Sequence, residues 1–322
     1  MDRIKISFIQ TSYNEKDFIR ECIESILSIN IKCPYEIIIV DDGSDDGSID
    51  IIKEYAAKYS DIIKYYVMER RGVINKYNTI LAKRLSNVLK KGFELAKSEY
   101  IININSDDYY VNKNFVDKAI KFLDNNKKYS ALSYGSKLIN NKNVNEIYDY
   151  PNQLYWATKY NTSCNYIVRN DERFKKSLMP NFCDDTSLTY SIITYGKIAF
   201  CNEIIHHYRE NENSIMHTTN EIEHLLLDMI IFHEMINYKR KCLISTYKRF
   251  WWVFQSLDKY KDCLDDPQYA LYIKEINKYN INLFKKYFYG NTFDKFIMKS
   301  IAKLTTIIFL IIYKKWLKYD HE

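Results

Sequence analysis

The chain has little glycine and little proline, seven and four in 322 residues, which argues against fibrous and disordered classes. It also lacks two common Gly-rich nucleotide-binding loops. No GxGxxG follows the first predicted strand and no GxxxxGK[ST] occurs, so neither the usual dinucleotide site nor a P-loop is expected. The seven cysteines form no CxxC pair and leave one over, which favours a reducing compartment in which thiols act as small core residues.

The two ends of the chain differ in character. The amino terminus, MDRIKISFIQTSYNEKD, has an apolar run far too short for a signal peptide, and its pattern predicts a strand. The last 38 residues hold eight Lys against three acidic residues, so most of the net charge of +6 lies there. A basic tail suggests an acidic surface, membrane or nucleic acid, and the apolar sequence within the tail favours membrane. The alternative is a solvated helical face.

Short apolar runs alternate with helical patterns over residues 1 to about 110. Strands are expected at residues 4–10, 35–40, 62–68 and 100–105, and helices from Phe18, over 49–59 with Ser48 as N-cap, and over 73–97. The run YEIIIV is continuously apolar, as in a parallel strand covered on both faces. The alternation predicts an α/β fold with a doubly wound, mostly parallel sheet.

The rest of the chain divides into a mixed part and a helical part. Residues 111–219 predict a helix at 115–125, strands at 131–139, 165–169 and 197–201, and a helix opening at Asp184-Asp185. The pattern beyond this is almost wholly helical. We therefore expect two domains, a sheet-based domain over residues 1–219 and a C-terminal all-helical extension over residues 220–322.

Three pairs of adjacent aspartates stand out: Asp41-Asp42, Asp107-Asp108 and Asp184-Asp185. The first two pairs follow predicted parallel strands, so both would emerge at the edge where α/β sheets bind ligands. Adjacent carboxylates repel, and a divalent cation that bridges them to phosphate oxygens would relieve the repulsion. The third pair opens a helix, where a carboxylate could be a general base. The alternatives are a solvated turn for the second pair and a helix N-cap for the third.

Four segments occur in a familiar order: ISFIQTSYNEKDFIRECIESIL, EIIIVDDGSDDGSIDII, GFELAKSEYIININSDD and CDDTSL. Over roughly residues 4–215 they resemble family 2 glycosyltransferases of the GT-A fold, a group of inverting nucleotide-sugar transferases. The resemblance implies a hexosyl- or N-acetylhexosaminyl-transferase of bacterial surface-polysaccharide biosynthesis. Its donor would be a nucleoside-diphosphate sugar, with UDP as the nucleotide, its acceptor a hydroxyl of a glycan or lipid-linked molecule, and its cofactor Mn²⁺ or Mg²⁺.

The resemblance also assigns roles to single residues. The positions that match the family's nucleotide contacts are Thr11, Tyr13, Glu15, Asp42, Arg84 and Asp107. Asp42 would receive the imino N–H of uracil, Arg84 would reach the base or the phosphates, and Asp107 would hold the ribose. Asp108 would bind the metal in a DxD-like motif, and Asp185 would be the catalytic base with Asp184 beside it. The implied mechanism is direct displacement at the anomeric carbon, with the cation stabilising the departing diphosphate.

One departure from the family concerns the third metal ligand. The segment that usually reads YRxHxxS is YRENENS here, so Asn211 replaces a histidine that the resemblance links to the metal. His217 is a nearby candidate ligand, and a lone surface histidine is the alternative interpretation. His206 and His207 are expected to be structural residues of a strand.

Residues 304–313, LTTIIFLIIY, carry no charge and are flanked by lysines. Ten residues cannot span about 30 Å of hydrocarbon, so one interpretation is a helix in the membrane interface, and the other is a buried or dimer-forming helix. The expected partners are thus donor, acceptor, and a membrane surface or a second copy of the chain, with no nucleic acid. The expected location is the cytoplasm, peripheral on the inner membrane face in the first case. The alternative function is a catalytically silent scaffold that acts through its helical tail.

Overall fold

The computed structural model describes residues 3–69, 81–140, 143–147, 163–178, 185–209, 220–237 and 266–278, with isolated positions between 291 and 307. The chain separates into two compact units. The first comprises Met1–Ile74, Leu81–Tyr150 and Asn161–Ser214, and the second comprises Asn75–Ile80, Pro151–Tyr160 and Ile215–Glu322. The two-domain boundary predicted at residues 219 and 220 stays a prediction.

The first half of the first unit alternates strand and helix as the sequence predicts. Its elements are β1 (Ile6–Ser12), α1 (Ile19–Leu27), β2 (Tyr35–Asp41), α2 (Ser48–Lys58), β3 (Ile63–Val67), α3 (Leu81–Leu95) and β4 (Tyr100–Asn105). β1 pairs in parallel with β2 on one side and with β4 on the other, and β2 pairs in parallel with β3. The carboxyl ends of β2, β1 and β4 therefore lie at the same edge of the sheet.

The second half of this unit extends the sheet with strands of both directions. Its elements are β5 (Tyr109–Tyr110), α4 (Phe115–Asn125), β6 (Tyr129–Asn140), β7 (Asn143–Ile147), the 3₁₀ turn η1 (Ser163–Asn165), β8 (Tyr166–Arg169), α6 (Glu172–Ser177), α7 (Asp185–Tyr195) and β9 (Lys197–Arg209). The nine strands run in the order β3-β2-β1-β4-β8-β6-β9-β5, with β7 paired to β6. The sheet is mixed: β3, β2, β1 and β4 are parallel, β8 is antiparallel to both of its neighbours, and β6 pairs in parallel with β9.

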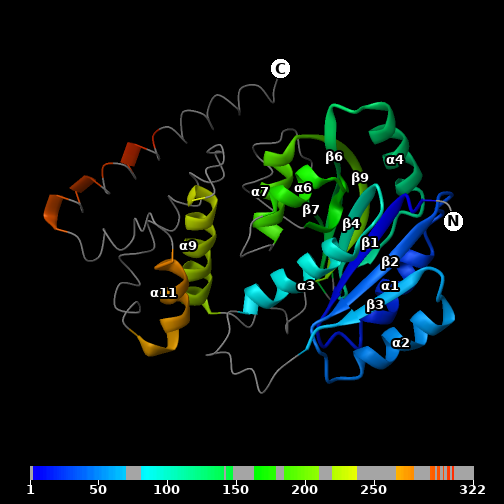
Figure 1. The fold of residues 1–322 in the computed structure, drawn as a ribbon, viewed down its shortest axis with the longest axis horizontal. Helices are drawn as coiled ribbons and strands as arrows, with labels where there is room; N and C mark the ends of the chain where they lie inside the picture. The colour runs from blue at the N-terminus through cyan, green and yellow to red at the C-terminus, as the bar shows by residue number, and fades with distance from the viewer. Residues whose placement is uncertain are drawn as a thin grey trace. The chain divides into compact units, whose positions relative to one another are not determined.

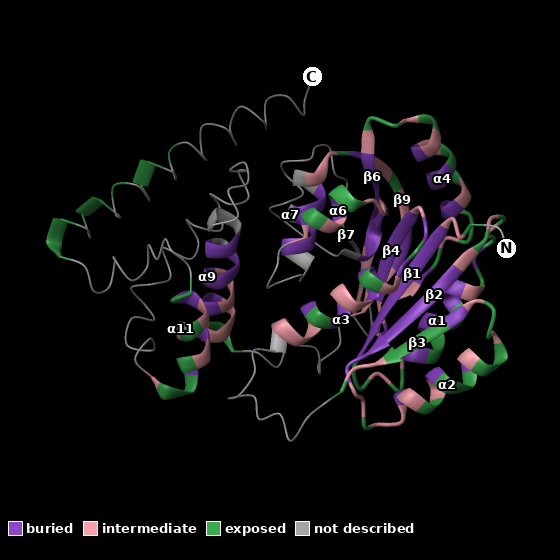
Figure 2. Ribbon diagram, viewed as in Figure 1, coloured by how far each residue is buried: buried purple, intermediate pink, exposed green. Residues whose placement is uncertain are grey.

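Helices cover both faces of the parallel strands (Figure 1). Ile6 and Phe8 of β1 belong to the core that includes Ile23 of α1 and Ile52 of α2. Ile9 points to the opposite face, where it meets Gly92 of α3. Figure 2 shows the result: β1, β2 and β4 are buried, whereas the edge strand β3 is largely exposed. This burial on both faces explains the continuous apolar runs of the sequence.

Two expectations from the sequence are wrong in detail. The strand predicted at residues 197–201 continues to Arg209, because it pairs in parallel with β6 through register shifts around Gly135 that no local pattern encodes. Ser48 is the first residue of α2 rather than its N-cap, which is Gly47 with φ 103°. The Ser48 hydroxyl instead accepts the backbone N–H of Glu15 at 3.0 Å, so it joins the turn after β1 to the turn after β2.

The described part of the second unit is helical. It contains α9 (Glu221–Asn237), the 3₁₀ turn η3 (Pro267–Tyr269) and α11 (Ala270–Ile276). Apolar residues of α9 such as Leu226 and Ile230 are buried, as are Tyr272 and Ile276 of α11. Among the residues that the structure describes, no helix has the length and apolar character to cross a membrane. The segment 304–313 lies mainly outside them, so its membrane or dimer role stays a prediction.

The contact between α3 and β1 yields a first testable prediction. A Cβ on Gly92 would lie 2.2 Å from Cγ2 of Ile9, which is far inside van der Waals contact. Gly92→Ala should therefore destabilise the protein by about 1–3 kcal/mol through overpacking, although alanine favours helix by about 1 kcal/mol. Urea unfolding measures this change. Asn87→Ala, at an exposed position of the same helix, is the control and should be neutral or stabilising. A higher midpoint for Gly92→Ala would contradict this packing.

Candidate functional site

The turns after β1, β2 and β4 are tied together at the edge of the sheet. The backbone N–H of Asp42 donates to the carbonyl of Ser12 at 2.9 Å, and that of Ser106 donates to the carbonyl of Thr11 at 2.9 Å. The Thr11 hydroxyl donates to Oδ1 of Asn105 at 2.9 Å. Thr11 is thus a buried link between two strands, and the three turns form one surface.

The two aspartates after β2 have different partners. Asp41 is buried and holds its own turn: Oδ1 accepts the N–H groups of Gly43 and Ser44, and Oδ2 accepts the Ser44 hydroxyl. Asp42 turns instead toward α3, where Arg84 donates to both carboxylate oxygens at 2.7 Å. Fork-to-fork pairs of this kind are strong and geometrically specific. Asp42 and Arg84, which are 42 residues apart in the chain, therefore form an ion pair. The resemblance had assigned both residues to the nucleotide.

The turn after β1 is fixed to the turn after β2. Asn14 has a left-handed backbone, φ 54°, which asparagine tolerates better than most residues. Its N–H donates to the Ser44 hydroxyl and its side-chain amide donates to Asp45, both at 2.9 Å. Tyr13, just before it, is 39% exposed. Tyr13 and Glu15 are thereby held at the rim of the surface formed by the three turns.

Glu15 lies in an unusual electrostatic environment. Burial, together with the charges of Asp107 and Asp46, raises the pKa of its carboxyl to about 8, against the lowering effect of Arg209. Glu15 and Asp107 come from different turns, and the charge of one acts on the other. At neutral pH the proton on Glu15 relieves part of that repulsion.

Adjacent Asp107 and Asp108 occupy different environments. Asp107 is half-buried, whereas Asp108 is 1% exposed. Oδ1 of Asp108 accepts the backbone N–H of Arg209 at 2.8 Å, and Oδ2 lies 3.8 Å from Nε2 of His206 and 3.9 Å from Sγ of Cys164. Asp108 thus points into the core, away from the surface on which the three turns meet.

The Asp108, Cys164 and His206 side chains form a buried cluster whose ligand atoms lie within 4.8 Å of one another. Burial, reinforced by the charge of His207, lowers the pKa of His206 to about 3, so this imidazole is neutral at physiological pH. A thiol and an imidazole suit softer metals, whereas a cation that bridges phosphates prefers oxygen ligands and a site that phosphates can reach. Glu15 and Asp107, two carboxylates near each other and less deeply buried, fit such an ion better.

Several predicted site residues cannot be placed in this way. Asp185 begins α7, as predicted for a helix opened by this pair, but its side chain is not among those that the structure describes. Asp184, Asn211 and His217 lie outside the described residues. His206 and His207 lie in strand β9, and Nδ1 of His207 is 3.1 Å from the Tyr109 hydroxyl.

Sequence reasoning missed Arg209, which contacts both aspartates after β4. Its backbone N–H donates to Asp108 and its Nε donates to the carbonyl of Asp107, each at 2.8 Å. The available signal was the Tyr-Arg that opens YRENENS, a segment that was read only for its missing histidine. Glu21 of α1, the ion-pair partner of Arg209, carried no signal at all.

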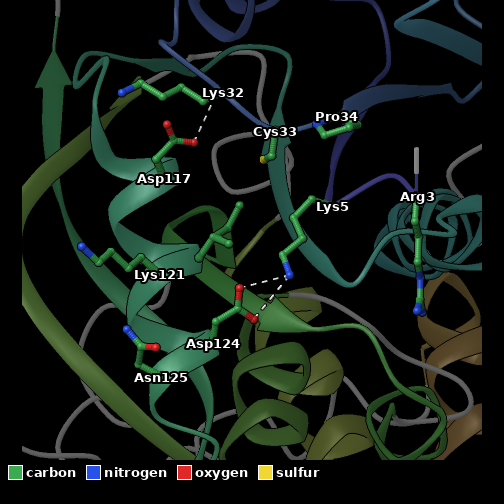
Figure 3. A pocket seen from close by; sticks show the side chains of 10 residues that line it. Arg3, Lys5, Lys32, Cys33, Pro34, Asp117, Lys121, Asp124 and Asn125 are labelled. Atoms are coloured by element: carbon green, nitrogen blue, oxygen red, sulfur yellow. Dashed lines mark hydrogen bonds and ion pairs between the residues drawn. The ribbon is translucent and has the colours of Figure 1, made fainter. Parts of the chain in front are cut away.

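A hollow lies at the other end of the parallel strands (Figure 3). It is lined by Lys5, which precedes β1, by Pro34, which precedes β2, and by Asp117 and Asp124 of α4. Lys5 is already paired with Asp124 at 3.1 Å. This hollow is distant in the fold from the turns that carry the predicted site residues, and its charges are of both signs.

Comparison with known proteins now decides the family. The family model described as "Glycosyl transferase family 2" matches residues 7–179, more than half of the chain and all three turns. The chain belongs to glycosyl transferase family 2. The resemblance inferred from the four sequence segments is therefore confirmed.

Related sequences align with about two thirds of the chain. Rv1520 of Mycobacterium tuberculosis is 24% identical over 225 residues, which cover 66% of this chain and 61% of that protein. The chain thus spans less than two thirds of the length of this relative. The Escherichia coli UDP-Glc:alpha-D-GlcNAc-diphosphoundecaprenol beta-1,3-glucosyltransferase WfaP is 27% identical over 227 residues, covering 69% of this chain and 82% of WfaP.

Solved structures of low sequence identity share the fold. S. aureus TarS 1–349, in complex with UDP-GlcNAc, superposes with a TM-score of 0.55 at 16% identity and covers 80% of this chain and 72% of that one. The Pyrobaculum calidifontis mannosyltransferase PcManGT, in complex with GDP-Man and Mn²⁺, has a TM-score of 0.50 at 14% identity, covering 100% of this chain and 89% of that one. These likenesses confirm the GT-A-like α/β fold.

The environment of Glu15 predicts a pH-dependent stability. The pKa of Glu15 is about 8 in the folded state and about 4.3 in model peptides. Between these two values the unfolded chain releases a proton that the folded protein keeps, so the free energy of unfolding decreases as pH rises. The stability of the wild type should therefore fall relative to Glu15→Gln as pH rises from about 5 to about 8, with Gln a few degrees higher in Tm at pH 8. Thermal unfolding between pH 5 and 9 measures the difference. A difference independent of pH would contradict the assigned environment.

Proposed function

We propose that this family 2 chain is a metal-dependent inverting glycosyltransferase that uses a UDP-sugar. The observation that carries the proposal is the meeting of Glu15, Asp42 and Asp107 at the carboxyl ends of three adjacent parallel strands. This edge is where α/β sheets bind nucleotides. The complexes of TarS with UDP-GlcNAc and of PcManGT with GDP-Man support a nucleotide-sugar donor.

Asp42 and Arg84 would bind the nucleotide as a unit. A carboxylate has about four acceptor positions on its two oxygens, so Asp42 can accept the imino N–H of uracil while Arg84 holds it in place. The bidentate pair fixes the plane of the carboxylate before the base arrives, which lowers the cost of ordering it on binding. Thr11 and Tyr13 line the same edge and complete the base and ribose contacts in this proposal.

We place the Mn²⁺ or Mg²⁺ on Asp107 rather than on Asp108. Asp107 is half-buried beside Glu15, whereas Asp108 is 1% exposed and directed at His206 and Cys164. The Mn²⁺ in the PcManGT complex supports a metal in this fold. When bound, such a cation supplies positive charge to the oxygens of the departing diphosphate. The sequence-based assignment of the metal to Asp108 stays the alternative, and the experiment below separates the two.

Asp185 would be the catalytic base. Its carboxylate would take the proton from the acceptor hydroxyl as the hydroxyl oxygen bonds to the anomeric carbon and the bond from that carbon to the diphosphate breaks. One base suffices for inversion, since no enzyme nucleophile forms an intermediate. Its place at the start of α7 supports the proposal only in part, because a carboxylate is also favoured there by the helix dipole.

The acceptor would be a glycan or lipid-linked hydroxyl. The name of the relative WfaP specifies a diphosphoundecaprenol acceptor, and a basic, partly apolar C-terminal segment would suit an enzyme that works on membrane-bound substrates. In this proposal the protein is cytoplasmic and peripheral on the inner face of the membrane. The alternative is that the same segment forms a dimer interface.

Titration calorimetry with UDP in the presence and absence of Mn²⁺ tests donor binding. Asp42→Asn should weaken UDP binding about tenfold or more, because the amide cannot accept from both the base and Arg84 in the same way. Asp107→Asn should abolish the gain in affinity from Mn²⁺, whereas Asp108→Asn should lower Tm and keep that gain. Loss of the Mn²⁺ effect only in Asp108→Asn would return the metal to Asp108. Absence of any nucleotide binding by the wild type would refute the proposed function.

The catalytic base has a separate test. Asp185→Asn should lower the rate of sugar transfer from UDP-sugars by about 10²–10⁴, the usual contribution of a general base, and leave UDP affinity within about twofold. Asp117→Asn is the matched control, because Asp117 also lies in the first turn of a helix but far from the three turns. It should retain full activity. An Asp185→Asn enzyme of wild-type rate would show that this carboxylate is only a cap.

A further inference from the structure

Arg209, the last residue of β9, contacts two segments that are distant from it in sequence. Its backbone N–H donates to Oδ1 of Asp108 and its Nε donates to the carbonyl of Asp107, both at 2.8 Å. Its Nη2 donates to Oε2 of Glu21 in α1 at 2.6 Å. One residue thus joins β9, the turn after β4 and the first helix.

The first two contacts determine how the two aspartates point. Asp108 is held inward by a backbone donor that belongs to a strand, so the contact does not depend on a flexible side chain. The carbonyl of Asp107 is held by Nε, which fixes the peptide between the two residues. With that peptide fixed and Asp108 in the core, the Asp107 side chain is confined to the half-buried surface beside Glu15.

The surroundings of the guanidinium make it a rigid support. It lies over the rings of Phe18 and Tyr109, with its central carbon 4.9 and 5.1 Å from their centroids. Its side chain is 20% exposed and is paired with Glu21. A planar cation that contacts two rings and is hydrogen-bonded through two of its nitrogens has few alternative rotamers, and lysine lacks both the planar guanidinium and the Nε–H contact.

We propose that Arg209 is a positioning residue for the metal and diphosphate site. It does not itself bind the donor but holds the peptide of Asp107 so that this carboxylate faces the cation, and it transmits that restraint to α1 through Glu21. The inference rests on the proposed function, since it takes Asp107 as the ligand. Residues that orient metal ligands commonly change metal affinity 10- to 100-fold when they are replaced.

The test is a titration of Mn²⁺ in the presence of UDP, followed by the electron paramagnetic resonance signal of free Mn²⁺. Arg209→Lys should bind Mn²⁺ about 10- to 100-fold more weakly than the wild type. Glu21→Gln, which removes only the ion pair of a half-exposed side chain, should weaken it severalfold and serves if Arg209→Lys folds poorly. Arg173→Lys is the matched control, because Arg173 also pairs with an aspartate and stacks on a tyrosine but is 78% exposed on α6. It should bind Mn²⁺ as the wild type does.

The outcomes separate this inference from the proposed function. If the wild type binds no Mn²⁺ with UDP, the proposed function fails and the inference fails with it. If the wild type binds Mn²⁺ and both Arg209→Lys and Glu21→Gln bind it equally well, only the positioning role is refuted. Thermal unfolding of each variant provides the second readout: weaker Mn²⁺ binding that merely follows the fraction of unfolded protein would mean that Arg209 is structural only. Weaker binding by fully folded variants is the predicted result.

Discussion

Repulsion between carboxylates at one end of a parallel sheet is the constraint around which the site is organised. Pairing of β2, β1 and β4 in parallel brings Glu15, Asp42 and Asp107 to the same edge. Each carboxylate needs an opposite charge or a proton there. Arg84 supplies the charge for Asp42, and Glu15 retains a proton because its pKa is about 8. A divalent cation bound with the diphosphate would neutralise the remaining negative charge at this edge of the sheet.

Two neighbouring aspartates show how the fold distinguishes chemically identical groups. Asp108 enters the core because a strand N–H and a neutral histidine lie there, whereas Asp107 stays at the surface because Arg209 restrains its carbonyl. Two arginines near these turns are paired with carboxylates, Arg84 with Asp42 and Arg209 with Glu21. Arg84 is pre-organised by Asp42 rather than left to order on binding, which would reduce the entropic cost of binding the donor.

The sequence predicted what depends on local pattern. Helix α4 and strand β4 have the predicted bounds, and the alternation of apolar runs indicated the parallel sheet. It could not predict β9 beyond residue 201, since its pairing with β6 contains register shifts. It assigned different roles to Asp107 and Asp108 only through the resemblance, and it could not predict their different environments, because both residues contact Arg209, about 100 positions away. Glu21 and Arg209, 188 positions apart, meet only in the folded chain.

A crystal structure of the protein with UDP and Mn²⁺, with anomalous scattering used to locate the metal, tests the central claim most directly. The account predicts Mn²⁺ coordinated by the Asp107 carboxylate and by diphosphate oxygens, with the uracil against Asp42 and Arg84 still paired to it. Mn²⁺ on the Asp108, His206 and Cys164 cluster, or a nucleotide bound away from the carboxyl ends of β1, β2 and β4, would contradict it.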